Sequence, residues 1–588
     1  MSIREVYLDP ITRIEGHLSI HVKMDVNAKK IIDAHSIATM FRGWEIILKR
    51  RDPPDAIFIT QRICGVCPVP HGYASAIALD MALQVSPPPL AIVLRNLCYA
   101  AEILYDHPIQ LFQLAGPDFS ALEVEKFNPT FWNAAQTYSC EYRDVHGYAT
   151  IADLIKAMNP LSGELYLFAL KMERLGRKMA SLIGAKHPHV NTFVPGGIAR
   201  TWGIKEAEQL ASMVITLTGF MKMVYAVWED IIQFFYDMGY ENVGVRPANL
   251  IAFGSIEDPD KYNAKYEDIT EWGRARLITP GVVLNGELIT TDLKDIHLRV
   301  REFVEHSFYE EWEGEFSEDP EGNPLDPNHP WNKETRPKPV STSFTGKYTW
   351  ATTPRWAYNG AYHVLGAGPI ARMWTTAAAG LVNITDPFVE IRTGNGQITL
   401  ELPETRSEDL PQSLWDATEI VWSVPDISVN GTKVINTLER YRARAFCVAY
   451  YAATALHDLY LMIDLVNKGK VEVWHQFTRP ALSFGVGLNE AARGALGHWV
   501  VVKNGRIHRY QVITPTNWNV SPRDPNGNPG PIEEALIDTP ITEESDASNW
   551  VGIDAVRTVR SFDPCLACTV HMYMGRRLVK KVLSVHGL

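Results

Sequence analysis

Two pairs of cysteines at opposite ends of the chain constrain its fold more than any other feature. Cys64 and Cys67 form the first Cys-x-x-Cys pair, and Cys565 and Cys568 form the second. Four thiolates are the number that a structural zinc ion, an iron–sulfur cluster or a nickel-containing site would use. Structural zinc sites usually take both pairs from a short segment, whereas almost the whole chain separates these two. If the pairs share one site, the fold must bring the two ends of the chain together.

The second pair follows a helix-start signal. Asp563 is a residue type that caps helices, and Pro564 suits the first helical position, where no N–H is needed. We therefore predict that Cys565 and Cys568 open a helix. Their spacing would turn both sulfurs to one side, and the positive end of the helix would favour thiolates. Two unrelated pairs, or a long-range structural zinc site, stay open as alternatives on spacing alone.

The length and composition are those of a large globular protein. The chain has 588 residues, of which 46% are hydrophobic, so it can bury a sizeable core. We predict one interlocked domain over 1–588, because both ends would close on one centre. The formal net charge of −12 is spread without long acidic or basic blocks, which argues against nucleic-acid binding. Outside the two pairs, Cys98 and Cys447 fit apolar helical runs as inert core residues, and Cys140 has no evident partner.

Neither the start of the chain nor its apolar runs indicate a membrane protein. Residues 1–5 lack the apolar core of a secretory signal. No uncharged apolar run approaches the roughly 18 to 20 residues needed to span a bilayer. We expect no signal peptide and no transmembrane segment in this chain.

Hydrophobic periodicity predicts a mainly α fold with small peripheral β-sheets, an α+β class with a core of long helices. Alternating apolar residues predict a β-hairpin over 17–37. A helical body is predicted over 71–468, with a loop-rich insertion at 313–340. A C-terminal lobe over 499–571 and an extension over 572–588 complete the chain. The long amphipathic segments expected to be helical are 151–184, 204–238, 289–311 and 433–468.

Six motifs, in order along the chain, resemble those of nickel-iron hydrogenase large subunits. They are DPITRIEGH at 9–17, FRGWE at 41–45, RICGVCPVPHG at 62–72, EAARGALGH at 490–498, PTNWN at 515–519 and DPCLACTVH at 563–571. The resemblance spans the chain and implies that family's fold and activity, the reversible heterolytic cleavage of H2 into protons and electrons. H2 uptake is the expected direction, and the insertions suggest the high-affinity actinobacterial-type branch.

The resemblance also implies a set of metal ligands. Cys64 and Cys565 would bind nickel terminally, while Cys67 and Cys568 would bridge nickel to iron, whose remaining ligands would be carbon monoxide and cyanide. Thiolates are soft donors that suit both metals. A magnesium ion near the site would be bound by Glu45, by the backbone carbonyl of Val512 and by His571, with waters in its remaining positions.

Four further residues take roles in proton transfer or in holding the site, by the same resemblance. The Cys565 thiolate would accept the first proton and Glu15 the next, although a salt bridge to Arg13 is the ordinary reading of Glu15. Arg493 would lie above the open metal site, fixed by the carboxylates of Asp118 and Asp563.

His71 would donate a hydrogen bond to a bridging sulfur or cyanide. One position departs from the family pattern: Ala492 stands where proline is usual, which changes the shape expected above the metals.

Partners follow from what the chain lacks. No further cysteine cluster could carry electrons away, so an iron–sulfur small subunit is expected, in a higher oligomer of heterodimers. The family's maturation protease and nickel-insertion proteins are expected partners too, and the protease would remove 572–588 unless this branch keeps them. The expected location is cytoplasmic, or membrane-associated through a partner. A metal-free subunit of the respiratory complex I type is an alternative, which the four cysteines argue against.

Overall fold

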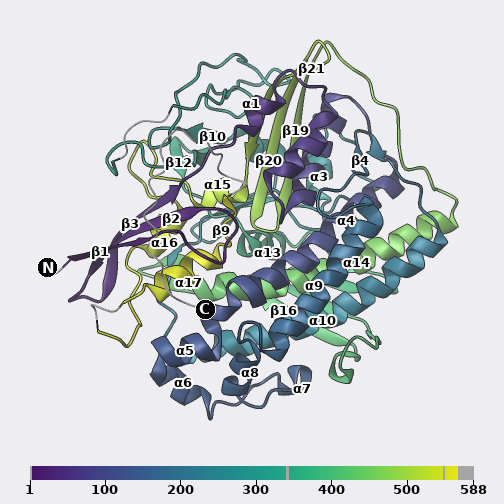
Figure 1. The fold of residues 1–588 in the computed structure, drawn as a ribbon. Helices are drawn as coiled ribbons and strands as arrows, with labels where there is room; N and C mark the ends of the chain where they lie inside the picture. Colours follow the sequence, from purple (N-terminus) through teal and green to yellow (C-terminus); the bar gives the residue numbers. More distant parts are fainter. Residues whose placement is uncertain (1–2, 339–342, 547–549, 567–588) are drawn as a thin grey trace.

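Four long helices form the centre of the molecule. The computed structural model describes residues 3–338, 343–546 and 550–566 (Figure 1). Within it α4 packs against α9 and α14, and α14 packs against α10. These helices are α4 (Pro89–Pro108), α9 (Glu164–Gly184), α10 (Ile204–Asp237) and α14 (Thr437–Asn467). The mainly α fold with small sheets is therefore confirmed.

Local sequence explains where these helices begin. α4 starts with Pro89, whose fixed φ and missing N–H suit the first turn. α14 is capped by Asn436, whose side chain accepts the N–H of Glu439. α10 and α14 are apolar and long enough to cross a membrane, but 78% of each apolar window is buried within the protein. Their composition is accordingly that of core helices.

The predicted hairpin near the N-terminus is present and gains a third strand. β1 (Ile3–Leu8), β2 (Leu18–Asp25) and β3 (Lys30–Ala38) form an antiparallel sheet in that order. A second three-stranded antiparallel sheet lies near the C-terminal end of the chain. It consists of β19 (Leu482–Ala491), β20 (Gly494–Lys503) and β21 (Arg506–Ile513), in that order.

Helix α3 (Pro68–Ala82) lies on β19 at unusually close range. A Cβ atom at Gly487 would stand 1.8 Å from the backbone oxygen of Ala74, and one at Gly485 would stand 2.0 Å from that of Ala78. Only glycine permits this approach. The two glycines therefore set how α3, which begins directly after Cys67, sits on the sheet.

The remaining elements are short and surround this core. The helices are α1 (Trp44–Leu48), α2 (Asp55–Thr60), α5 (Ala121–Phe127), α6 (Pro129–Ala135), α7 (Arg143–His146), α8 (Ile151–Ala157), α11 (Ile269–Arg274), α12 (Leu293–Leu298), α13 (Pro369–Ala379), α15 (Pro515–Asn519), α16 (Pro531–Leu536) and α17 (Ile553–Ser561). The strands are β4 (Phe193–Val194), β5 (Gly197–Ile198), β6 (Arg246–Pro247), β7 (Leu250–Ala252), β8 (Gly281–Leu284), β9 (Glu287–Thr290), β10 (Val300–Phe303), β11 (Thr353–Tyr358), β12 (Ala361–His363), β13 (Asn383–Thr385), β14 (Glu390–Gly394), β15 (Gln397–Leu402), β16 (Thr418–Ser423), β17 (Ser428–Val429) and β18 (Thr432–Ile435).

One predicted helix is wrong. The segment 289–311 contains only the short helix α12, and the residues after it form strand β10. β10 pairs antiparallel with β11, about fifty positions further along the chain. There Glu302 turns inward and forms a buried ion pair with Lys333, so its polar side chain does not mark an exposed helix face.

The two ends of the chain are joined by hydrogen bonds far from the cysteines as well as near them. Ile31 N–H donates to the carbonyl of Thr539 at 3.0 Å, and Ser36 N–H donates to the buried carboxyl of Glu533 at 2.9 Å. Residues 313–338 contain no regular strand or helix in the described part of the insertion, as predicted. The extension 572–588 lies outside the described residues.

Candidate metal centre

Three of the four predicted cysteine sulfurs meet in the interior. The Sγ atoms of Cys64 and Cys565 lie 3.2 Å apart, and those of Cys67 and Cys565 lie 4.0 Å apart. All three residues are buried, and their sulfurs lie within 4.8 Å of one another. Cys568 lies outside the described residues. The fold thus brings sulfurs from both ends of the chain to one point, which two unrelated pairs would not do.

The first pair is held in a tight loop. Cys64 is extended after a 3₁₀ turn at Gln61–Ile63, and Cys67 directly precedes Pro68, the first residue of α3. The backbone N–H groups of Val66 and Cys67 donate to Cys64 Sγ, each at 3.3 Å. Hydrogen bonds to the sulfur favour the thiolate, the form of cysteine that binds metals.

A helix begins at Leu566, directly after Cys565, close to the predicted start; from residue 567 the chain lies outside the described residues. Helix α17 ends at Ser561, Asp563 has a φ of 52°, and Cys565 pairs with Glu15 in a parallel bridge. The Cys565 N–H donates to Thr516 Oγ1 at 3.0 Å. Distant segments therefore bind the backbone of Cys565, and the helix begins after this residue rather than at Pro564.

Glu15 lies beside the sulfurs. Cys565 Sγ and Glu15 Oε2 are 3.2 Å apart, within hydrogen-bond reach for a thiol. Arg13 turns elsewhere, because its guanidinium donates to the carbonyl of Leu114 and pairs with Asp118. The structure therefore brings Glu15 to the Cys565 sulfur, while Arg13 is paired with a different carboxylate; the role of Glu15 as a proton acceptor stays a prediction.

Arg493 is buried with two carboxylates. Its Nη1 lies 3.1 Å from Asp106 Oδ2, and its Nη2 lies 3.1 Å from Asp563 Oδ1. Burial by itself would lower the pKa of Arg493, but the two carboxylates outweigh burial and raise it. Burial raises the pKa of Asp106 to about 7. Arg493 therefore remains charged beside the sulfurs, with Asp563 in its predicted place.

The prediction that Asp118 fixes Arg493 is wrong. Asp118 pairs with Arg560 at 2.6 Å and also with Arg13, and these two cations hold its pKa below the usual value in spite of burial. Asp118 thus ties the N-terminal loop to α17. Asp106 takes the predicted role instead, and the sequence offered one signal for it, a carboxylate within the apolar helical run of α4.

His71 belongs to a buried hydrogen-bonded chain. Its Nδ1 lies 3.1 Å from Nε2 of His498, whose Nδ1 lies 2.8 Å from the hydroxyl of Tyr510. Tyr510 donates to Ser75 Oγ at 2.9 Å. Burial lowers the pKa of His71 to about 4, so the ring is neutral at neutral pH. Its hydrogen bond to a bridging sulfur or cyanide stays a prediction.

The predicted magnesium ligands come from elements that touch. Glu45 lies on α1, which packs against β21, the strand that carries Val512. Glu45 faces a cavity of about 150 Å³ that is also lined by Lys333 and Gln511. Burial raises the pKa of Glu45, an effect that a bound cation would reverse. His571 lies outside the described residues.

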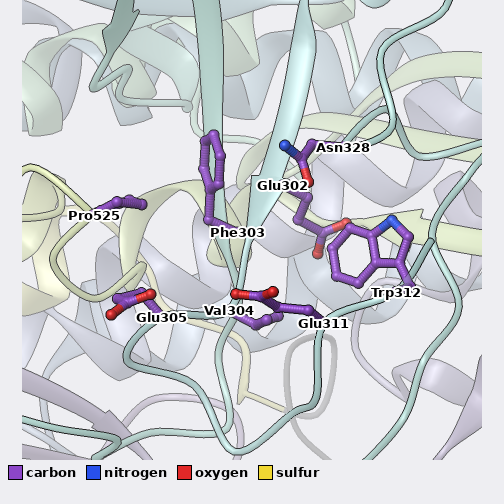
Figure 2. A pocket seen from close by; sticks show the side chains of 8 residues that line it. All are labelled: Glu302, Phe303, Val304, Glu305, Glu311, Trp312, Asn328 and Pro525. Atoms are coloured by element: carbon purple, nitrogen blue, oxygen red, sulfur yellow. The ribbon is translucent and has the colours of Figure 1, made fainter. Parts of the chain in front are cut away.

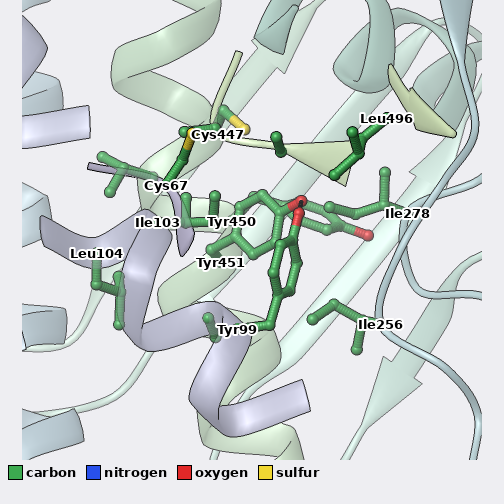
Figure 3. Packing of buried hydrophobic residues seen from close by; sticks show 14 of the residues in the cluster. Cys67, Tyr99, Ile103, Leu104, Ile256, Ile278, Cys447, Tyr450, Tyr451 and Leu496 are labelled. Carbon is green, nitrogen blue, oxygen red and sulfur yellow. Dashed lines mark hydrogen bonds between the residues drawn. The ribbon is translucent and has the colours of Figure 1, made fainter. Parts of the chain in front are cut away.

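The cysteines outside the pairs are accounted for by packing. Burial raises the pKa of Cys98, and it raises that of Cys447 to about 11, so both are inert thiols. Figure 3 shows Cys67 and Cys447 among apolar and aromatic side chains that include Ile103 and Tyr451. The loop that carries Cys64 and Cys67 thus rests on the hydrophobic core.

Cys140 has partners that the sequence did not reveal. Its sulfur, a ring nitrogen of His146 and a carboxyl oxygen of Asp230 lie within 4.8 Å of one another. Asp230 accepts the N–H groups of Glu141 and Tyr142 and lies 2.8 Å from His146 Nε2. His146 Nδ1 accepts a further N–H at 3.1 Å. The polar atoms of Asp230 and His146 therefore have hydrogen-bond partners within the protein, and the cluster anchors α7.

A separate acidic cavity lies beside strand β10. It has a volume of about 210 Å³ and is lined by Glu302, Glu305, Glu311 and Trp312, among others (Figure 2). None of the described site residues lines this cavity.

Comparison with known proteins agrees with the arrangement of the sulfurs. A family model described as nickel-dependent hydrogenase matches residues 42–158 and 153–571, and a model described as HoxL-like matches residues 5–39. The uptake hydrogenase large subunit of Rhizobium leguminosarum bv. viciae is 29% identical over 97% of this chain and 95% of its own length. The periplasmic [NiFeSe] hydrogenase large subunit of Desulfomicrobium baculatum is 31% identical over 99% of this chain and 97% of its own length.

A solved structure is similar throughout. The actinobacterial-type NiFe-hydrogenase from Ralstonia eutropha H16 superposes with a TM-score of 0.92 and 40% identity, covering 97% of this chain and 100% of that chain. The three buried cysteine sulfurs agree with these matches, because thiolates are the soft ligands that nickel and iron in low oxidation states prefer. The chain belongs to the nickel-dependent hydrogenase family.

Proposed function

We propose that this chain is the catalytic large subunit of an uptake hydrogenase, which cleaves H2 into protons and electrons. The observation that carries the proposal is the meeting of Cys64, Cys67 and Cys565 sulfurs within 4.8 Å in the interior. Relatives over nearly the full length are named as uptake hydrogenase large subunits. Cys568 would complete the donor set, and the four thiolates of Cys64, Cys67, Cys565 and Cys568 would hold nickel and iron.

When bound, the two metals supply Lewis acidity that makes H2 acidic enough to lose a proton. The chain supplies the groups that receive that proton. The Cys565 sulfur accepts it first, and Glu15 Oε2 lies 3.2 Å from this sulfur to take it next. Arg493 stays charged because Asp106 and Asp563 bind it, so its positive charge stabilises negative charge that develops near the sulfurs.

We assign three further groups to the site by the resemblance. Carbon monoxide and cyanide would supply the remaining ligands of the iron. Magnesium would be bound by Glu45, the carbonyl of Val512 and His571. The contact between α1 and β21 supports this assignment, because it brings Glu45 and Val512 from distant parts of the sequence to neighbouring elements.

Electrons leave through a partner. We propose an iron–sulfur small subunit, because the described residues hold one cluster of cysteines that could serve redox chemistry, and it is the one at the active site. Removal of 572–588 by a maturation protease, nickel insertion by accessory proteins, assembly into a higher oligomer of heterodimers, and a cytoplasmic or partner-mediated membrane location are parts of the same proposal.

Elemental analysis of the co-purified two-subunit complex, together with an assay of H2-dependent dye reduction, tests the function. We expect the complex to contain nickel together with iron in excess of nickel, because the small subunit adds its iron–sulfur clusters, and the separated large subunit to contain the two metals in equal amounts. Dye reduction should require H2. Zinc alone would support a structural metal site, and a metal-free chain would support a subunit of the complex I type. Either result would contradict the proposal.

A further inference from the structure

A second set of buried acids lies behind the sulfurs, on helix α4. Glu102 and Asp106 are one helical turn apart and therefore share a face of α4. Both residues are 0% exposed. Asp106 binds Arg493 through Oδ2, while its Oδ1 and the Oε1 of Glu102 have no hydrogen-bond partner among the described residues. An interior carboxyl with an unused oxygen has not been placed for stability, because leaving it unpaired costs free energy.

Glu102 is in contact with the loop that carries the first cysteine pair. Its Oε2 accepts the N–H of Val69, two positions after Cys67, at 2.8 Å. Burial raises the pKa of Glu102 well above its usual value, and the neighbouring Asp106 adds to the effect. Cys64 raises it further and Arg493 lowers it. Glu102 is therefore a neutral acid at neutral pH and has a proton to give.

Tyr105 continues from Glu102 toward the surface. Its hydroxyl lies 3.3 Å from Glu102 Oε2 and 3.1 Å from the carbonyl of Val66. The ring is fixed by α9, where a Cβ at Gly176 would stand 2.9 Å from Tyr105 Cβ. The guanidinium of Arg177 lies 5.5 Å from the centre of the ring. The hydroxyl thus has a defined position next to the acid.

His187 ends the series in a half-buried position. Its Nε2 lies 3.1 Å from the Tyr105 hydroxyl, and the two rings meet edge to face at 5.2 Å. Burial lowers the pKa of His187 to about 4, with Arg177 and His189 adding to the effect. A proton that reached this ring would therefore pass on to water rather than stay.

We propose that Glu102, Tyr105 and His187 form a proton-conducting chain that links the Arg493–Asp106 side of the metal centre to the surface, separate from the Glu15 side. The inference rests on the proposed function, since the protons come from H2 cleavage. Each residue acts on the proton after it leaves the reacting atoms, so these are relay residues. The substrate of this chain is the proton alone.

The transfer balances in four steps. The Glu102 O–H bond breaks as its proton bonds to the Tyr105 oxygen, and the original Tyr105 O–H bond breaks as that proton bonds to Nε2 of His187. The imidazolium then releases its Nδ1 proton to water. Glu102, now a carboxylate, takes a new proton at Oε1 as the Oδ1–H bond of a protonated Asp106 breaks, and Asp106 takes up the next proton released by H2 cleavage. A half-turn of the Glu102 carboxyl group, a rotation of the Tyr105 hydroxyl and a flip of the His187 ring, which returns the N–H to the side facing water, restore the starting arrangement.

The contacts could instead serve only to hold the cysteine loop, and three variants of the two-subunit complex separate these roles. Glu102→Gln keeps an oxygen for the Val69 N–H but cannot carry a proton. Tyr105→Phe keeps the ring but loses the hydroxyl. His187→Ala removes the terminal acceptor and leaves space for a small base. Asp458→Asn is the control, because Asp458 is also a buried acid of raised pKa but lies on α14, where it is bonded to Asn96 of α4 and to none of the three relay residues.

We expect the three relay variants to keep nickel and iron at the wild-type level and to lose at least about tenfold in H2-dependent dye reduction. Added imidazole should restore a large part of the rate in His187→Ala and none in Tyr105→Phe. Glu102→Gln should also remove an infrared band of a neutral carboxyl from the spectrum of the complex. Asp458→Asn should keep the wild-type rate.

Wild-type rates in Glu102→Gln and Tyr105→Phe would overturn the relay, as would a His187→Ala complex whose rate imidazole does not change. Loss of metal in all three variants would assign them to loop positioning and would also overturn it. These outcomes leave the proposed function intact, because the wild-type complex would still bind nickel and iron and oxidise H2. A wild-type complex without those metals would overturn the function itself.

Discussion

At the scale of single residues, the proposed chemistry depends on a short contact between Cys565 and Glu15. The sulfur and the carboxyl oxygen are 3.2 Å apart, and no rotation of either backbone is needed to pass a proton between them. Arg13 does not compete for the carboxylate, because Asp118 and the carbonyl of Leu114 bind its guanidinium. The neighbouring arginine therefore leaves Glu15 available to the sulfur.

Glu15→Gln tests this contact. The amide keeps the size of the carboxyl and can still approach Cys565, but it cannot accept a proton. We expect nickel and iron to stay bound while the exchange of deuterium from D2 into water slows by on the order of a hundredfold. Mass spectrometry of the gas phase measures the exchange. Glu123→Gln, on the first turn of α5, is a matched control that should exchange at the wild-type rate.

Asp106 and Asp118 give a second residue-scale test. The sequence predicted that Asp118 holds Arg493, whereas in the structure Asp106 does so and Asp118 binds Arg560. Asp106→Asn should weaken the hold on Arg493 and lower H2 oxidation by about tenfold with the metals retained, since a charge-assisted bond becomes a neutral one. Asp118→Asn should leave Arg493 in place and instead lower the thermal stability of the complex. Dye-reduction rates and melting temperatures of the two variants measure the difference. The reverse pattern would return Asp118 to the site.

At the scale of elements, α3 and β19 place the first cysteine pair. Gly487→Ala would put a Cβ atom 1.8 Å from the backbone oxygen of Ala74, so α3 would have to move away from the sheet. We expect a loss of stability of about 1–3 kcal/mol and a lower nickel content, because Cys67 directly precedes α3. Thermal unfolding and elemental analysis measure the two effects.

Gly203→Ala is the control for this substitution. Gly203 precedes α10 with a φ of −137°, and its Cβ would meet only the flexible end of Glu206. Stability and nickel content should stay at the wild-type level. Equal effects of both substitutions would show that the close packing of α3 on β19 does not position the cysteines.

Elements also show what the sequence could and could not predict. Motifs located Cys64, Cys565, Glu15 and Arg493, because their spacing is local and their chemistry is specific. Asp106 lies in none of these motifs, and its one signal, a carboxylate within an apolar helical run, does not identify Arg493 as its partner. The helix predicted over 289–311 fails for a similar reason: pairing with β11 decides the structure of β10, and this pairing is not visible in local periodicity.

At the scale of the whole molecule, the two ends of the chain are joined at more than the metal centre. The buried carboxyl of Glu533 accepts the N–H of Ser36 and the hydroxyl of Tyr348, both at 2.9 Å. Burial raises its pKa to about 7, against about 4.3 in an unfolded chain. The folded state therefore binds more protons in this window, so this group stabilises the fold below about pH 4.3, and that contribution is lost as the pH rises through 7.

Glu533→Gln should remove that pH dependence. The neutral amide keeps an acceptor oxygen for Ser36 without the cost of a buried charge, so we expect the melting temperature of the variant to exceed that of the wild type above pH 7. Below pH 4 the two should agree. Calorimetric scans of the complex across this range measure the difference. A variant that melts below the wild type at pH 8 would contradict the assigned ionisation.

Nickel X-ray absorption of the two-subunit complex tests the central claim most directly, because it counts the sulfurs bound to the metal. The wild type should show sulfur ligands from both ends of the chain, and Cys64→Ser and Cys565→Ser should each reduce or abolish the nickel–sulfur signal. A signal that either substitution leaves unchanged would contradict a centre shared by the two ends.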